Sequence, residues 1–577
     1  MGTSDGAGAQ LSAAGRPPRP GGFPGGNLMP LEEELVAGAA AGKLVDRGDG
    51  PFDLAEMRRW GEERTVRAAV LRHLLVTRQW PLHAKGVQLR GVRIDGHLDL
   101  EGATLRCPLL LESCYLDASE AANLKYAAAS SVTLIGCRLA GFTGEMLTAK
   151  ALTLSCSTFT GPLRLAGVSV AGSFRCSGAQ LTGRDEDGYA PSAYKSGYAL
   201  SAYKSKVGDV FLGEGFSTAG AVELAGADIA GSLSCSGAQL TGRDEDGYAL
   251  SAAGIKVGGD VHLGDGFTAE GGISLISARF GGSLEVMPTR LAGNEEDADQ
   301  DDDDEEEVSL DASNAQITGA LHWLPAEQVR GQVNLEGAAA GELKDDWTSC
   351  NGWKNGHWPC GGRLNLDGFT YVSLGGYERT SADQRLTWIR SQYRRSDTSW
   401  QGFATQPYEQ LAAVYRHAGQ DDQARKVAIA RRADLRKYGN LNRYRRFGNW
   451  FLDWSIKYGY QTWRAATGLA ALFVVFLALS ILAQHQHAIV PIGEIEGLHP
   501  APSVTQCMSN YPCFYPVGYT IDTVIPIINV HQTDYWGPDG HAPWGWAWLG
   551  LTWVVTGLGW ALATLLVAGY TGLVRRD

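Results

Sequence analysis

The sequence predicts a mainly β chain: a right-handed parallel β-helix solenoid with a helical N-terminal cap, a C-terminal helical hairpin and two transmembrane helices. Three observations predict this fold. A short apolar pattern recurs between residues 86 and 375, two uncharged apolar segments follow, and lysines and arginines crowd beside those segments. The length of 577 residues also exceeds one ordinary core, so we expect more than one structural unit.

The N-terminal region is predicted to hold a tail and a cap. Residues 1–50 are expected to be a disordered tail, because the stretch GRPPRPGGFPGG lacks an apolar core. Residues 51–85 are expected to form a helical cap, in which residues 54–76 place Leu71, Leu74 and Leu75 on one apolar face. The cap would cover the open end of the β-helix, where strand edges are otherwise unpaired.

The repeat over residues 86–375 has apolar or small residues at its first, third, sixth and eighth positions. Copies of it begin at Leu98, Leu109, Val132, Leu163, Phe174, Val222, Leu233, Ile273 and Leu364. Adjacent copies start eleven residues apart, and strands of two or three residues cannot form an independent hairpin sheet. Two copies therefore predict one turn of about 22 residues, with glycine at the tight corners.

A stretch of nineteen residues occurs twice in nearly identical form. GSFRCSGAQLTGRDEDGYA begins at Gly172, and GSLSCSGAQLTGRDEDGYA begins at Gly231. A solenoid grows by duplicating whole layers, so we interpret the charged loop in each copy as solvated surface. The alternative is a repeated carboxylate cluster that binds a cation, at Asp185, Glu186 and Asp187 and again at Asp244, Glu245 and Asp246.

Other polar features of the repeat region predict no reaction chemistry. The acidic insertion 292–307 contains eleven acids between Glu295 and Glu307, and self-repulsion should keep it unfolded. Six cysteines are expected to be small core residues, namely Cys107, Cys114, Cys137, Cys156, Cys176 and Cys235. Cys350, His357 and Cys360 lack the paired spacing of a zinc site. The sequence thus predicts no catalytic, cofactor-binding or metal-binding residue.

The C-terminal third predicts a membrane anchor. A basic helical coupler is expected over residues 400–464, transmembrane helices over 465–485 and 548–573, and an external loop over 486–547. Eleven lysines and arginines lie between Arg425 and Arg464, and none lies in the loop, which predicts cytoplasmic termini in the inner (plasma) membrane. The basic residues expected beside the anionic inner leaflet of the bilayer are Arg443, Arg445, Arg446, Arg464, Arg575 and Arg576. The net charge of −13 gives no reason to expect nucleic acid as a partner.

The predicted external loop holds the candidate site residues. Cys507 and Cys513 are a candidate disulfide, with two unpaired thiols as the alternative. Tyr519, Asp522 and Pro526 mark a candidate pore or loop site. The segment is interpreted either as an interfacial cover on the outer face or as a re-entrant pore helix. Its prolines at positions 512, 516 and 526 favour the cover, because they leave pieces too short for a full span.

Several segments carry a family resemblance. They are GVRIDGHLDLEGATL, YEQLAAVYRHAGQDDQARKVAIARR, YGYQTWRA, YTIDTVIPIINVHQTDYW and the ending GLVRRD. Together they resemble a family of bacterial membrane-associated β-helix proteins, similar to pentapeptide-repeat and bactofilin-like folds, with two C-terminal transmembrane helices. Some members are labelled membrane-associated oxidoreductases. This chain has no nucleotide fingerprint, CxxC or haem motif that would support such a label.

Three functions follow as expectations. The favoured one is a scaffold or sensor that binds a protein partner through the β-helix face and couples it to the membrane. The alternative is a two-span channel-like or membrane-perturbing effector gated by the cytoplasmic β-helix. The third is a cofactor-free or mislabelled oxidoreductase, although the sequence favours a role without catalysis. A homo-oligomer is compatible with the first two functions.

Overall fold

A computed structural model of the chain describes residues 26–48, 50, 52–117, 119–183, 197–291, 307–329, 331–345, 349–350, 353–354, 357–359, 361–376, 381–393, 403–439, 442, 463–492, 511–525, 527–540 and 545–570. The chain divides into two compact units, residues 1–423 and 424–577, which are described separately.

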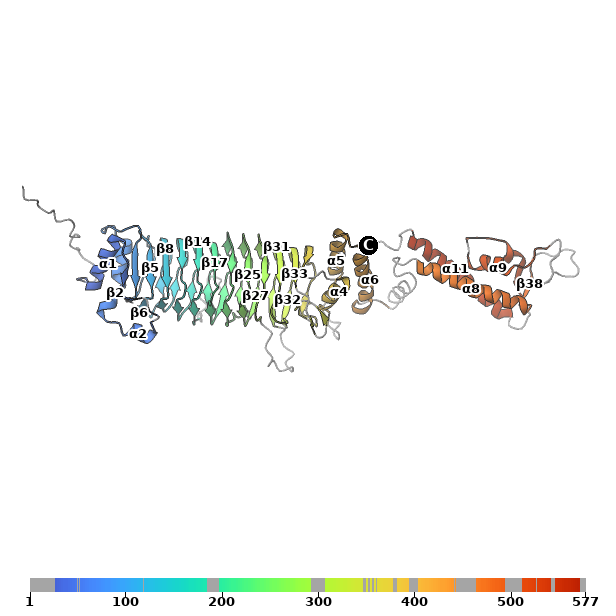
Figure 1. The fold of residues 1–577 in the computed structure, drawn as a ribbon, viewed down its shortest axis with the longest axis horizontal. Coiled ribbons are helices and arrows are strands. Elements are labelled where there is room, and N and C mark those ends of the chain that lie inside the picture. Colours follow the sequence, from blue (N-terminus) through green and yellow to red (C-terminus); the bar gives the residue numbers. More distant parts are fainter. Residues whose placement is uncertain are drawn as a thin grey trace, which may run out of the picture. The chain divides into compact units, whose positions relative to one another are not determined.

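The first unit is built mainly from three parallel sheets, here called A, B and C (Figure 1). Sheet A contains β1 (Val45–Asp46), β3 (Val87–Arg90), β5 (Leu109–Glu112), β8 (Ala128–Ile135), β11 (Thr148–Thr153), β14 (Ser169–Arg175), β17 (Lys206–Phe211), β20 (Asp228–Ile229), β21 (Leu233–Ser234), β24 (Lys256–Val257), β25 (Val261–Leu263), β28 (Arg279–Phe280), β29 (Leu284–Val286), β31 (Gln316–Trp323), β33 (Ala339–Asp345) and β37 (Thr370–Gly375). Sheet B contains β2 (Thr65–Arg67), β4 (Arg93–Asp95), β6 (Tyr115–Asp117), β9 (Arg138–Leu139), β12 (Thr158–Phe159), β15 (Gln180–Leu181), β18 (Ser217–Thr218), β22 (Gln239–Leu240) and β26 (Thr268–Ala269). Sheet C contains β7 (Ala122–Asn123), β10 (Phe142–Thr143), β13 (Leu163–Arg164), β16 (Tyr198–Ser201), β19 (Ala221–Glu223), β23 (Tyr248–Ser251), β27 (Gly272–Ser274), β30 (Val308–Asp311), β32 (Gln332–Asn334) and β36 (Leu364–Asn365). A short antiparallel pair, β34 (Ser349–Cys350) and β35 (Trp353–Lys354), lies outside them.

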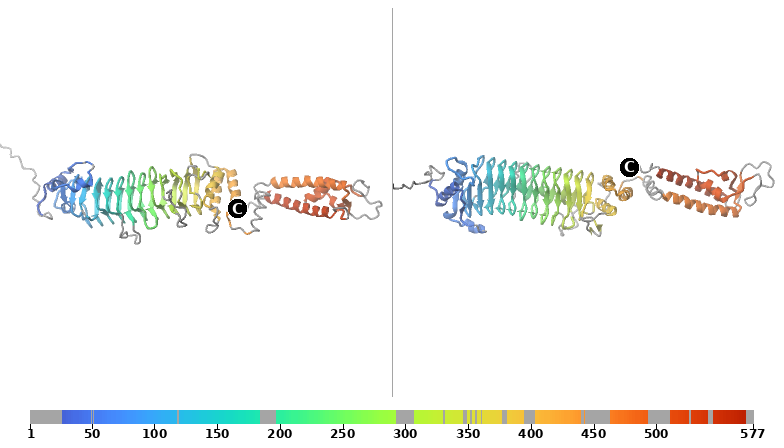
Figure 2. Two further views of the ribbon diagram at one scale, coloured as in Figure 1. Left: turned by 90° about the horizontal axis from the view of Figure 1, so that it is seen from below. Right: turned by 45° about the horizontal axis from the view of Figure 1, so that its top comes forward.

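The strand register of sheet A places residues of the same type next to each other on neighbouring strands. Leu89 pairs with Leu111, which is 22 residues later, and Leu111 pairs with Leu134, which is 23 residues later. All three side chains are buried. The parallel strands and the predicted apolar positions are therefore confirmed, and the strands lie side by side in each view (Figure 2). The first residue of every predicted repeat copy is buried as well.

The corners of the repeat share one backbone conformation that the sequence analysis did not locate. The fifth residue of all nine predicted copies has a positive φ, between 48° and 74°. Most of these residues are glycines, but Ser113 and Ser277 take the same conformation. Non-glycine residues pay about 1–2 kcal/mol for this conformation, so the packing of the neighbouring strands must compensate.

Longer connections leave the columns of buried residues intact. Leu163 pairs with Leu200, and Ile273 pairs with Leu310, each across 37 residues rather than about 22. The extra residues fall at 184–196 and 292–306, outside the described residues, as does most of the predicted acidic insertion. Sheet C stays paired across both positions, because β13 pairs with β16 and β27 pairs with β30.

The N-terminal end differs from the prediction. Helix α1 (Pro30–Ala41) and strand β1 lie within the predicted tail, so that prediction is wrong from Pro30 onward. The cap is also not one helix: α2 (Leu54–Arg58), the 3₁₀ helix η1 (Glu62–Arg64) and α3 (Ala68–Val76) are separated by Gly61 and β2. Buried Glu32 accepts hydrogen bonds from Arg67 Nε at 2.8 Å and Nη2 at 2.6 Å. Burial alone would raise the pKa of the Glu32 carboxyl. Hydrogen bonds from Arg67 and from the Met29 backbone outweigh this effect and lower the pKa below its usual value.

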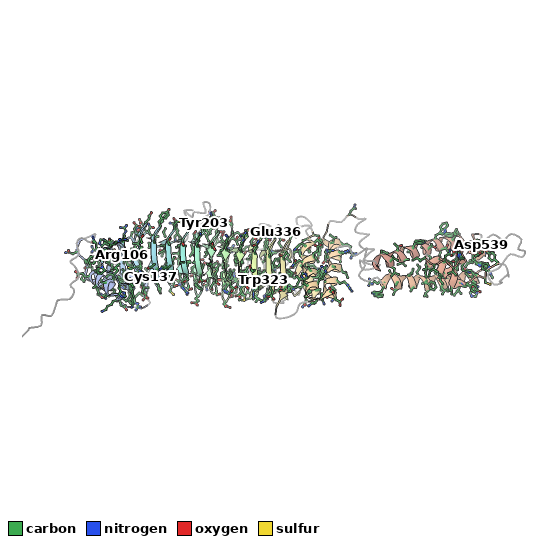
Figure 3. All side chains as sticks on the ribbon, turned by 90° about the horizontal axis from the view of Figure 1, so that it is seen from above. Arg106, Cys137, Tyr203, Trp323, Glu336 and Asp539 are labelled. Atoms are coloured by element: carbon green, nitrogen blue, oxygen red, sulfur yellow. The ribbon has the colours of Figure 1, made fainter. Side chains whose placement is uncertain are left out.

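The C-terminal end of the sheets is covered by α4 (Ala382–Arg390) and α5 (Gln406–His417). Arg385 Nη1 and Nη2 donate to Asp345 at 2.7 and 2.6 Å, and both side chains are buried. Trp358 Nε1 donates to the same carboxylate at 2.8 Å, and its ring stacks on Trp323, which lies near this end in Figure 3. Burial alone would lower the pKa of the Arg385 guanidinium. The charge and hydrogen bonds of Asp345 outweigh this effect and raise the pKa above its usual value. Breaking such a buried pair costs about 3–5 kcal/mol, so this cluster anchors the end.

The second unit holds two long apolar helices, α8 (Trp463–His485) and α11 (Gly545–Tyr570), where the sequence predicted its spans. Both are long and apolar enough to cross a membrane. Between them lie α9 (Pro516–Val524), α10 (Gln532–Tyr535) and an antiparallel pair of β38 (Ile489–Pro491) and β39 (Trp536–Pro538). Helix α6 (Asp421–Tyr438) begins at the end of the first unit and carries part of the predicted basic run.

Two side chains predicted from the repeat are placed differently in the structure. Asp244, predicted as solvated, is buried: its Oδ1 accepts from the backbone of Asp246 and Tyr248, and its Oδ2 accepts from the Tyr198 hydroxyl. Cys156, predicted as core, is exposed, because it occupies a positive-φ corner. The other five repeat cysteines are buried as predicted, and burial raises the pKa of Cys235 to about 12.

We expect Asp244→Ala to lower the free energy of unfolding by about 2 kcal/mol, because it leaves buried donors without a partner. Glu245→Ala is the matched control: Glu245 is the next residue and is exposed, so its removal should change stability by less than about 0.5 kcal/mol. Thermal unfolding of the two variants measures the difference. Equal effects would contradict a structural role for the Asp244 carboxylate.

Candidate functional site

The strongest candidate site is the intervening segment, which we define as the described residues 486–492, 511–525 and 527–540. It joins the C-terminal end of α8 to the N-terminal end of α11, here called the loop end of the two helices. Gly468 of α8 faces Leu562 of α11, while Phe476 and Ser480 line a small cavity with Trp548 and Thr552. The two helices therefore run antiparallel. Asp539 lies at the loop end, where its N–H donates to Ala488 O at 2.9 Å (Figure 3).

Helix α9 follows from local chemistry. Pro516 occupies its first turn, where no backbone N–H is needed. The hydroxyls of Thr520 and Thr523 donate to carbonyls four residues earlier at 2.8 Å, so neither polar group is left unpaired against α8 or α11. The helix ends at Val524, two residues before a proline, as the restricted backbone of pre-proline residues favours.

Helix α9 lies along the apolar helices, as Figure 1 shows. The buried Tyr519 ring stacks on Phe476 at a centroid distance of 6.3 Å, and Thr520 Oγ1 lies 3.4 Å from Ser480 Oγ. Phe476 precedes the end of α8 by nine residues, about 14 Å of helix. Tyr519 is thus buried well inside the helix pair.

The end of α9 reaches close to the middle of α11. The Val524 carbonyl packs so closely on Gly559 that an added methyl group would overlap it. Gly559 lies 14 residues after the start of α11, about 21 Å along a helix of 26 residues, or about 39 Å. A cover lying across the loop end would not reach this depth. The end of α9 therefore packs beside the middle of α11 and not at the loop end.

Asp522 fixes the return of the chain. Its carboxylate accepts the N–H of Val530 at 2.5 Å, of Gln532 at 2.6 Å and of Thr533 at 3.2 Å. These bonds close the loop after α9 and satisfy the first N–H groups of α10. Asp522, a candidate pore or loop residue in the sequence, thus closes a hairpin through its carboxylate. Pro526, the third residue of that prediction, lies outside the described residues.

Aromatic packing holds the hairpin against the loop end. Trp536 Nε1 donates to Pro512 O at 3.0 Å, and the Tyr511 hydroxyl donates to Tyr535 O at 2.7 Å. Buried Gln532 accepts from Tyr515 N at 3.0 Å. Gln532 and Ser480 were not among the predicted site residues; the signal for Ser480 is a polar residue inside an otherwise apolar span.

The remaining predicted residues are only partly described. Cys513 is disulfide-bonded, and Cys507, its predicted partner, lies outside the described residues. Arg464 lies in the first turn of α8 and is half-buried. The other membrane-proximal arginines of the prediction, at positions 443, 445, 446, 575 and 576, lie outside the described residues.

The contacts described for the intervening segment are apolar packing, aromatic stacking and hydrogen bonds. Within the described ranges, no group of three or more His, Cys, Asp or Glu side chains is arranged to hold a metal ion. No family model matches the chain, and comparisons with curated proteins and with solved structures find no match.

We expect Gly559→Ala to destabilise the second unit by about 1–3 kcal/mol, because the methyl group overpacks the Val524 carbonyl. Gly557→Ala is the matched control, since open space surrounds Gly557 and alanine is the better helix former. Tryptophan fluorescence during thermal unfolding in detergent compares the two variants. If both behave like the unmodified chain, α9 does not pack at this depth.

Proposed function

We propose that the chain is a membrane-anchored scaffold or sensor: a right-handed parallel β-helix in the cytoplasm, joined through basic helices to two transmembrane helices. The order of the strands supports the β-helix, because the chain passes repeatedly through sheets A, B and C and pairs with its previous passage. An ion pair at each end supports a closed stack of fixed length: buried Glu32 with partly buried Arg67, and Asp345 with Arg385, which are both buried. The family that its motifs resemble fits the same architecture.

The observation that carries the membrane part is the uncovered apolar surface of α8 and α11. Only 17% of the most apolar stretch of each helix is buried. Val474 and Trp553 are 63% and 70% exposed. A core helix of a water-soluble protein would be mostly covered, whereas hydrocarbon is a suitable solvent for such a surface.

Charge and thiol chemistry support the orientation. Lysines and arginines concentrate before α8 and are lacking between residues 485 and 547 of the sequence. The disulfide of Cys513 fits an oxidising compartment on the loop side. We propose that the loop end faces outward in the inner (plasma) membrane, and that the β-helix presents its outer face to a protein partner.

A second candidate is a channel-like effector. One observation favours it: α9 ends near the middle of α11 rather than at the loop end. Half-helices that enter a membrane from one side are tolerated where they line a water-filled cavity or are buried in protein. The scaffold role remains the main proposal, because the β unit accounts for most of the chain.

Thiol labelling in intact cells tests the proposal. We expect Gly540→Cys, exposed on the loop side, to react with a membrane-impermeant maleimide, and Gln420→Cys, exposed beside α6, to react only after permeabilisation. When the membranes are washed with alkaline carbonate, we expect the chain to remain in the membrane pellet. Labelling of Gln420→Cys in intact cells would refute the orientation, and extraction by carbonate would refute the anchor.

A further inference from the structure

We propose that the hairpin tip, defined as residues 527–531, is a self-association surface that meets the same tip of further copies of this chain around a shared water-containing space. This inference rests on the proposed membrane insertion of α8 and α11. It adds the partner, a second copy of the chain, and the residues that meet it.

The first step is the depth of the tip. The tip follows the end of α9, which packs on Gly559. Val530 N–H donates to Asp522, two residues before that end, so the tip stays near the same depth. Gly559 lies about 21 Å from one end of α11 and about 17 Å from the other, and the hydrocarbon core of a bilayer is about 30 Å thick. With α8 and α11 spanning the membrane, the tip lies close to its midplane.

The second step is the surface that the tip presents. Ile527, Ile528 and Val530 are 75%, 50% and 46% exposed, and Asn529 and His531 are exposed as well. The backbone here is not helical, and His531 has a φ of 63°. His531 Nδ1 lies 2.8 Å from the exposed Asp534 carboxylate. Polar side chains and irregular backbone thus share one uncovered surface.

The third step concerns the medium that surrounds the hairpin tip inside the membrane. Lipid chains cannot hydrogen-bond irregular backbone, which at membrane depth occurs only where protein buries it or water reaches it. An asparagine and a His–Asp pair facing hydrocarbon would add further cost. In contrast, the exposed Val474 of α8 lies about 17 Å from the loop end, on regular helix with apolar neighbours, and suits lipid. The tip therefore requires a cover that Val474 does not.

The fourth step is the identity of the cover. Symmetric association brings the same patch of each copy together around one axis, and it needs no second protein. Three branched apolar side chains can pack between neighbouring tips, while Asn529 and His531 face a common wet centre. The Asp522 bonds hold the tip in one shape before association, which lowers the entropic cost of forming the contact.

The experiment uses the full chain with the exposed Cys156 replaced by Ser, reconstituted into phosphatidylethanolamine–phosphatidylglycerol vesicles. Asn529→Cys is compared with Val474→Cys, a matched control at similar depth. Each is treated with a disulfide-forming oxidant and, separately, with a water-soluble methanethiosulfonate. We expect at least tenfold more cross-linked dimer, and at least tenfold faster modification, for Asn529→Cys. Native mass spectrometry of the Cys156→Ser chain should show an oligomer.

The outcomes separate this inference from the proposed function. A monomeric mass, with Asn529→Cys as unreactive as Val474→Cys, would overturn the inference while leaving the anchor in place. An oligomer whose Asn529→Cys forms no cross-link would also overturn it, because another surface would then join the copies. Carbonate extraction together with equal, fast modification of both cysteines would instead overturn the membrane insertion.

Discussion

In-register stacking of parallel strands is the constraint on which the first unit depends. Each passage of the chain must return to the same corner, so that residues such as Phe142, Leu163 and Leu200 lie in one column. A slip of one residue would turn every inward side chain outward. The corner must therefore be sharp and identical each time, which explains why the fifth residue of each repeat has a positive φ whether or not it is glycine. Where 37 residues rather than about 22 separate two partners, as between Leu163 and Leu200, the strand pairing is the same.

The features that could be predicted from the sequence are those that depend on short-range patterns of apolar residues. The apolar positions recur at fixed spacing, so the buried columns and the two apolar helices could be found in advance. The corner conformation was missed because serine at 113 or 277 does not reveal its φ. Burial of Asp244 was missed because it depends on Tyr198, which lies 46 residues earlier in the chain and reaches the loop only after the strands stack. The depth of α9 depends on Gly559, which lies 35 residues beyond Val524, and no local signal specifies that approach.

The second unit obeys a different constraint. Its helices leave most of their apolar surface uncovered, and small or polar residues occur where α9 meets them: Ser480 beside Thr520, and Gly559 beside Val524. Small residues let two backbones approach closely, and short hydroxyl side chains can donate hydrogen bonds to carbonyls of their own helix. Asp522 then closes the hairpin through three backbone N–H groups. Under the proposed function, a stack closed at both ends would act as a rigid body, while the membrane unit carries the segment able to associate.

Cryo-electron microscopy of the full chain in lipid nanodiscs tests this view most directly. We expect α8 and α11 to cross the disc, α9 to end near the midplane beside α11, and the parallel strands to lie wholly on one side. A map in which α9 lies at the headgroup surface, or in which α8 and α11 lie outside the disc, would contradict the membrane architecture proposed for this chain.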